Sequence, residues 1–126
     1  MRLVRQGEYS NTCGHACAAM LANTTLERVV SILDHDRPTK WHELQGILFI
    51  LGVVADVDMV PCFSPEEMPR VCMVTVPTAS PAIKHFVVKY GGEVYDPARG
   101  IYPVWQLPFS PRAAEVLRYA RVRNVD

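Results

Sequence analysis

The segment IKHFVVKYGGEVYD, residues 83–96, has the pattern of a β-hairpin, because two runs rich in β-branched and aromatic residues flank a glycine pair. A two-residue turn at 91–92 places Val87 opposite Asp96. Alternate residues of a strand share a face, so His85 is then a diagonal neighbour of Asp96, about 7–8 Å away at the backbone. A side-chain hydrogen bond can span that distance. The hairpin therefore predicts a bonded pair of His85 and Asp96.

The rest of the chain divides into a helical first half and a strand-rich second half. Apolar spacing predicts helices at 13–21, 26–33 and 41–51, the second opened by a capping box of Thr24 and Glu27. The second half predicts strands at 53–60 and 71–76, with one short helical turn between them that a capping box of Ser64, Pro65 and Glu67 opens. It also predicts a last helix at 111–120 and an edge strand in the tail 121–126. This order predicts an α+β fold in which N-terminal helices pack on a C-terminal antiparallel β-sheet.

Length and composition are those of one domain. The chain has 126 residues, 49% of them hydrophobic, so residues 1–126 can bury their own core. Lys and Arg number 13 against 13 Asp and Glu, and this balance gives no basic excess for binding nucleic acid. The longest apolar run, 47–51, is far shorter than the roughly 20 residues of a membrane span. The N-terminus turns polar too early for a signal peptide, so a cytoplasmic protein is expected.

Cys13 lies where a polar turn meets an apolar helical run that Asn11 or Thr12 can cap. It is therefore expected in a first helical turn, where unpaired N–H groups and the helix dipole favour a thiolate over a thiol. The alternative is a small buried core cysteine, which is the expectation for Cys17 and Cys72.

A reactive cysteine needs a proton shuttle, and the chain contains four histidines. His15 lies two residues after Cys13, and residues two apart on a helix do not face each other. His35 belongs to a polar loop and is expected to face solvent. His85 has a predicted carboxylate partner, which would fix the tautomer of the imidazole and stabilise the imidazolium. Cys13, His85 and Asp96 would together supply a nucleophile, a base and an orienting acid.

A metal site is the competing interpretation of Cys13, His15 and Cys17. Structural zinc sites usually combine two pairs of ligands, whereas Cys62 and Cys72 are isolated in the sequence. No metal and no cofactor is therefore predicted. Cys62 follows a proline and is expected to be partly exposed.

Four pieces of sequence occur in a particular order along most of the chain: Gln6, CGHAC (13–17), HFVV (85–88) and DPARG (96–100). Together they resemble the papain-like cysteine peptidases of the bacteriocin-processing type, which cut leader peptides after a double glycine. The resemblance implies a small papain-like fold and a peptide or protein substrate. It also implies roles for the site residues: Cys13 as nucleophile, His85 as general base and acid, Asp96 as orienting residue, and Gln6 as donor to the oxyanion hole.

The chain departs from the family pattern near the cysteine. Thr12 stands where the family usually has Asp, and the spacing from Gln6 to Cys13 is one residue longer than usual. Two other functions fit the same residues. A transglutaminase-like acyltransferase or a glutamine deamidase would use Cys13, His85 and Asp96 in the same order. A non-catalytic binding module could have a peptidase-like fold without the activity.

Overall fold

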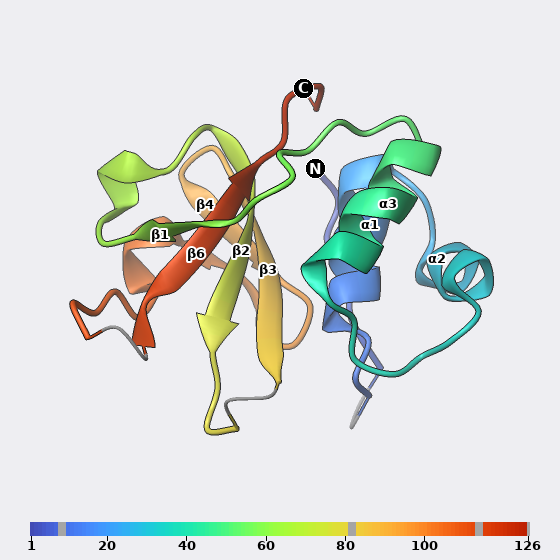
Figure 1. Ribbon diagram of the computed structural model, residues 1–126, viewed down its shortest axis with the longest axis horizontal. Helices are drawn as coiled ribbons and strands as arrows, with labels where there is room; N and C mark the ends of the chain where they lie inside the picture. Colours follow the sequence, from blue (N-terminus) through green and yellow to red (C-terminus); the bar gives the residue numbers. More distant parts are fainter. Residues whose placement is uncertain (8–9, 81–82, 113–114, 126) are drawn as a thin grey trace.

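Three helices and six strands form the fold in Figure 1, a computed structural model that describes residues 1–7, 10–80, 83–112 and 115–125. The helices form one layer and the antiparallel sheet forms the other, beside it. The first half of the chain supplies the helices and the second half the strands. The α+β prediction is confirmed: three N-terminal helices pack against a six-stranded antiparallel sheet.

The helices are α1 (Cys13–Ala22), α2 (Leu26–Leu33) and α3 (Trp41–Ile50). The N-cap of α2 is Thr25 rather than the predicted Thr24, and its hydroxyl accepts the N–H of Arg28 at 3.2 Å. Gly52, with φ of +86°, follows the end of α3 in a conformation that favours glycine. Among the described residues, no single helix is long and apolar enough to cross a membrane. Only α1 and α2 taken together, bent by 113°, meet that criterion.

Antiparallel pairing joins the strands in the order β1-β6-β2-β3-β4-β5. Their bounds are β1 (Val60–Cys62), β2 (Val71–Pro77), β3 (Lys84–Tyr90), β4 (Glu93–Asp96), β5 (Gly100–Pro103) and β6 (Leu117–Arg121). Two short 3₁₀ turns, η1 (Pro65–Glu67) and η2 (Val104–Gln106), lie between strands. The position of η1 confirms the short helical turn predicted after Ser64.

β3 and β4 form the predicted hairpin in the predicted register. Tyr90 pairs with Glu93 across the turn. Gly91 has φ of +61°, which a glycine adopts without strain. β5 was not predicted, and it extends the hairpin by pairing with β4, where Asp96 lies opposite Gly100.

The helix predicted at 111–120 is wrong where the structure describes it, because residues 117–121 form β6; residues 113–114 lie outside the described part of the chain. β6 pairs with β1 on one side and β2 on the other, so it is not the edge strand predicted in the tail 121–126. The helix propensity of this segment is a local preference. Pairing on both sides supplies backbone partners and buries Leu117, and it outweighs that preference.

Most of the strand predicted at 53–60 is also wrong. The segment forms an isolated bridge between Ala55 and Val122 before β1 begins at Val60. Val54 and Val57 are exposed. The β-branched residues here therefore belong mainly to a connection between α3 and the sheet.

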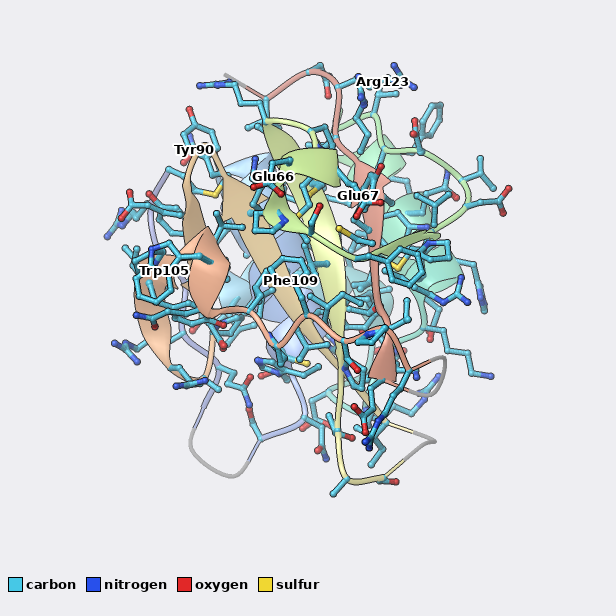
Figure 2. All side chains as sticks on the ribbon, turned by 90° about the vertical axis from the view of Figure 1, so that its left-hand side faces the viewer. Glu66, Glu67, Tyr90, Trp105, Phe109 and Arg123 are labelled. Carbon is cyan, nitrogen blue, oxygen red and sulfur yellow. The ribbon has the colours of Figure 1, made fainter. Side chains whose placement is uncertain are left out.

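Two hydrophobic clusters cover the two faces of the sheet, since alternate residues of β2 enter different clusters. Met73 belongs to the cluster between the sheet and the helices, and Val74 to the cluster on the other face. Figure 2 looks onto that second face, where Phe109 lies across the strands and the 69% exposed Trp105 lies on η2. On the helical side, α1 packs against β3 and against both other helices. This packing sets the start of α1 beside β3.

Candidate active site

Cys13 is the first residue of α1, and Thr12 occupies the N-cap position. The predicted place of Cys13 in a first helical turn is therefore confirmed. The Thr12 side chain makes no capping bond, because its hydroxyl pairs with that of Ser10 at 2.8 Å. The N–H groups of the first turn thus remain able to stabilise negative charge at the start of the helix.

Gly14 allows the segment before α3 to approach the first turn of α1. A Cβ atom at this position would overlap the hydroxyl of Thr39 and lie 2.9 Å from a methyl group of Leu44. Glycine is therefore the residue that lets Thr39 pack beside Cys13. The stretch 38–39 then forms one wall of the pocket at this cysteine.

His85 and Asp96 are hydrogen-bonded, as the hairpin register predicts. The distance from Nε2 of His85 to Oδ1 of Asp96 is 2.8 Å. The bond joins the second residue of β3 to the last residue of β4. Asp96 is only 1% exposed, and a buried carboxylate is a strong acceptor because water does not compete for it. The bond fixes the orientation of the His85 ring.

Three further donors to Asp96 were missed by the sequence analysis. The backbone N–H groups of Ala98 and Arg99 donate to Oδ1 at 2.9 and 3.3 Å. The hydroxyl of Tyr102, on β5, donates to Oδ2 at 2.8 Å. Tyr102 is a diagonal neighbour of Asp96 across β4 and β5, so the same register argument would have found it if β5 had been predicted.

The sulfur of Cys13 lies beside His85. Cys13 and His85 line the same pocket and interact closely enough to shift each other's pKa, and the sulfur lies 4.0 Å from the carbonyl oxygen of Lys84. Because Nε2 of His85 is bonded to Asp96, Nδ1 is the ring nitrogen left for the sulfur. Cys13, His85 and Asp96 therefore follow one another in a row, in which His85 and Asp96 are hydrogen-bonded.

The Cys13–His85 pair favours its charged form. Burial raises the pKa of the Cys13 thiol, but the hydrogen bond with His85, the N–H groups of Phe86 and Gly14 and the charge of His85 outweigh burial, so the pKa is lowered. Burial lowers the pKa of His85, yet its hydrogen bonds with Asp96 and Cys13 and their charges raise it to about 9. Both shifts therefore favour the charged forms, a thiolate on Cys13 and an imidazolium on His85.

The other three cysteines favour the neutral thiol. Burial raises the pKa of Cys17 well above its usual range, raises that of Cys72 to about 12, and raises that of Cys62. The prediction that Cys17 and Cys72 lie in the core is confirmed. The prediction that Cys62 is partly exposed is wrong, because the chain folds over it and its thiol donates to the carbonyl of Ser64 at 3.1 Å.

Gln6 lines the same pocket as Cys13. Its backbone N–H donates to the carbonyl of Pro97 at 3.1 Å, which ties the N-terminal segment to the loop after β4. Its side-chain Nε2 donates to the carbonyl of Ser10 at 3.1 Å. A primary amide has two N–H groups, so a second one is left for another acceptor near Cys13.

The pocket beside Cys13 is small, about 140 Å³. Its described lining residues come from the N-terminal segment, the stretch before α3 and the two ends of the β2–β3 connection: Gln6, Ser10, Asn11, Cys13, Pro38, Thr39, Thr78, Ile83, Lys84, His85 and Phe86. A larger hollow of about 380 Å³ lies between residues 2–5 and the α1–α2 connection. The smaller pocket is the candidate site, because it holds the thiol and the imidazole with shifted pKa values.

A second polar cluster lies on the other side of the first turn of α1. His15 is fully buried, and its Nε2 lies 2.8 Å from the carbonyl oxygen of His35. Nε2 of His35 lies 3.1 Å from Oε2 of Glu43. The prediction that His35 faces solvent is wrong, since its ring packs edge-on against that of His15 with centroids 5.3 Å apart. The cluster joins α1 to α3 and to the loop between α2 and α3.

The site defined by these residues is a cysteine beside a hydrogen-bonded histidine and aspartate at the edge of a small pocket. In the part of the chain that the structure describes, no group of three or more His, Cys, Asp or Glu side chains is arranged to hold a metal ion. The chain matches no model of a known protein family, and no curated protein is significantly similar to it in sequence. The geometry of the site is therefore the basis for assigning its chemistry.

Proposed function

We propose that the protein is a cysteine peptidase of papain-like fold and mechanism that acts on a peptide or protein substrate. The observation that carries this proposal is the placing of Cys13, at the start of α1, in one pocket with His85, which is hydrogen-bonded to the buried carboxylate of Asp96. A thiol of lowered pKa beside an imidazole of raised pKa is the arrangement that activates a cysteine nucleophile.

In the proposed reaction, the Cys13 thiolate attacks the carbonyl carbon of the scissile amide and a C–S bond forms. The electron pair of the carbonyl moves to oxygen, where the backbone N–H of Cys13 and Nε2 of Gln6 would donate to it. The His85 imidazolium gives its proton to the amide nitrogen as the C–N bond breaks, and the amine leaves. A thioester on Cys13 remains.

Water completes the proposed cycle. His85, now neutral, takes a proton from a water molecule as the water oxygen attacks the thioester carbonyl. The C–S bond then breaks, the thiolate leaves, and the product acid releases its proton to solvent. Asp96 stays ionised throughout and keeps the ring of His85 oriented, as the acid of a triad does. The imidazolium and the thiolate are restored together.

The test is cleavage of a mixed peptide library in ¹⁸O-labelled water, read by mass spectrometry. We expect new C-termini that carry ¹⁸O with the wild-type protein and with Cys17→Ala, which changes a core cysteine one helical turn away. We expect none with Cys13→Ala, and a large loss with Asp96→Asn. Cleavage by Cys13→Ala would overturn the proposal.

Added hydroxylamine separates the related chemistries that the same residues could perform. New chain ends, as acids or as hydroxamates, would indicate a peptidase. Where ammonia is released from glutamine side chains without chain cleavage, side-chain hydroxamates would indicate an acyltransferase and side-chain acids a deamidase. An unmodified library would indicate a binding module.

A further inference from the structure

Asp96 lies between two side chains that come from the strands on either side of it. His85 on β3 bonds to Oδ1, and Tyr102 on β5 donates to Oδ2 at 2.8 Å. Tyr102 reaches this oxygen because Asp96 pairs with Gly100, two residues earlier on β5, and alternate residues share a face. Three adjacent strands therefore each supply one side chain to a row that ends at the Cys13 sulfur.

We propose that Tyr102 is a positioning residue of this site, whose hydroxyl fixes the Asp96 carboxylate with Oδ1 directed at His85. The proposal deepens the proposed function and rests on it for its catalytic meaning. Rotation about the terminal torsion of an aspartate is soft, so the hydrogen bonds of the carboxylate set its orientation. Oδ1 accepts from His85, Ala98 and Arg99, whereas the donor that the structure describes for Oδ2 is Tyr102.

Burial makes this hydroxyl important. Asp96 is 1% exposed, so Oδ2 cannot exchange Tyr102 for bulk water. A buried acceptor that loses its partner keeps the full cost of its desolvation. Without the hydroxyl, the carboxylate would turn away from His85 or take up a proton, and either change would weaken the bond that orients the imidazole.

Burial and the neighbouring Asp96 carboxylate keep the Tyr102 hydroxyl protonated, so it can donate a hydrogen bond. Burial, and then the bond to the Asp96 carboxylate and its charge, raise the pKa of the phenol far above its usual value, while the charge of Arg99 opposes them. The guanidinium of Arg99 lies 5.4 Å from the centre of the Tyr102 ring. Burial raises the pKa of Asp96, but the hydrogen bonds from His85, then Tyr102, hold it below its ordinary value.

Tyr102→Phe tests the proposal, because it removes the hydroxyl and leaves the ring. The first readout is the titration of the Asp96 carboxyl by ¹³C NMR, which does not depend on any peptidase activity. We expect its midpoint to rise by about one pH unit, as loss of a hydrogen bond to a charged group implies. The second is the rate of Cys13 alkylation against pH, whose acid-side decline should move upward in parallel.

Controls separate a positioning role from a structural one. Tyr119→Phe removes a hydroxyl from β6, away from the site, and should leave both titrations unchanged. In an Asp96→Asn background, Tyr102→Phe should change the alkylation profile no further, since the hydroxyl acts through that carboxylate. Full additivity of the two variants, or a wild-type carboxyl titration in Tyr102→Phe, would overturn the proposal. Slow alkylation of wild-type Cys13 would instead overturn the proposed peptidase function. The carboxyl titration would still test whether the Tyr102 hydroxyl stabilises the ionised Asp96.

A measurement that leaves Tyr102 in place covers the case in which Tyr102→Phe does not fold. In Asp96→Asn the phenol loses its charged acceptor, so one of the five tyrosines should ionise at lower pH than in the wild type. Ultraviolet absorbance of the phenolate follows this titration. Identical tyrosine titrations in the two proteins would contradict the bond between Tyr102 and Asp96.

Discussion

Position on the helix, rather than residue type, distinguishes Cys13 from the other cysteines. Cys13 has a lowered pKa at the start of α1, while burial raises the pKa of Cys17 one turn later. An ordinary cysteine is only a few per cent thiolate at pH 7. We therefore expect iodoacetamide to label Cys13 at least about tenfold faster than the other cysteines at neutral pH, as read by mass spectrometry of peptides.

The pH dependence of that labelling has a defined sign. Because the pKa of Cys13 is lowered, its labelling should persist below the pH at which an ordinary thiol becomes unreactive. His85→Ala removes a hydrogen bond and a positive charge that lower this pKa, so the midpoint should move to higher pH. Protein unfolded in urea, in which all four cysteines label alike, is the control. Preferential labelling of Cys62 or Cys72 in the folded protein would show that Cys13 is not activated.

Gln6 can be tested at the same scale. A donor aimed at a developing oxyanion is worth roughly 10²–10³ in rate. Gln6→Ala should therefore lower kcat on a cleavable peptide by that factor, because Nε2 would no longer reach the oxyanion. Asn11→Ala is the matched control, since Asn11 lines the same pocket. Wild-type turnover by Gln6→Ala, with a loss in Asn11→Ala, would assign the donor to Asn11.

The pairing of His85 with Asp96 could be predicted from sequence because it depends on the register of one hairpin. The two glycines set the turn, and the alternation of side chains along the two strands then places His85 and Asp96 on one face. The bond of Tyr102 with Asp96 follows the same rule. It was missed because β5 has only four residues, GIYP, one of them a proline, which is too little to predict a strand. The cluster of His15 with His35 depends on packing between separate elements, which local patterns do not contain.

At the scale of elements, the contact between α1 and the segment before α3 depends on Gly14. Gly14→Ala would force a methyl group against Thr39 and Leu44, and overpacking of this kind costs about 1–3 kcal/mol. We expect that loss in the free energy of unfolding measured in urea. Gly46→Ala is the matched control, because this α3 glycine has no heavy atom within 4 Å of an added Cβ. The free energy of unfolding of Gly46→Ala should rise by up to about 1 kcal/mol, because alanine has a higher helix propensity than glycine. Equal effects of the two substitutions would contradict the close approach at Gly14.

The last strand shows where sequence patterns fail at this scale. Residues 111–120 contain good helix formers, yet β6 is paired on both sides by strands that begin more than 40 residues earlier in the chain. Periodicity reports which face of an element is buried, but not which distant element pairs with it. The helices 13–21 and 26–33 were predictable because their periodicity and start signals are local.

At the scale of the molecule, the proposed catalytic groups come from both layers. The helical layer supplies Cys13, and the sheet supplies His85 and Asp96. Cys13 and His85 therefore meet only when α1 is packed on β3. Loss of tertiary structure should abolish the excess reactivity of Cys13 over the other cysteines even if α1 stays helical, which makes this excess a measure of the whole fold.

The stability of the whole molecule should depend on pH through two histidines with opposite shifts. Burial lowers the pKa of His15, so below pH 6.5 the unfolded chain takes up a proton that the folded protein does not. His85 has a raised pKa of about 9, so its contribution to stability is full below pH 6.5 and is lost as the pH rises toward 9. Between pH 6.5 and 5, His85 is protonated in the folded protein and becomes protonated in the unfolded chain, so its contribution to stability rises to its full value as the pH falls. A loss of stability in this window therefore belongs to His15 and not to His85.

We therefore expect the free energy of unfolding in urea to fall as the pH is lowered from 6.5 to 5, by at most about 1.4 kcal/mol per pH unit for one proton. His15→Gln should flatten this dependence, whatever it does to the stability at pH 7, because the group that takes up the proton on unfolding is gone. His42→Gln changes an exposed histidine of α3 and should keep the wild-type slope. A wild-type slope in His15→Gln would show that another group takes up the proton, and that the buried imidazole between α1 and the loop before α3 does not control acid stability.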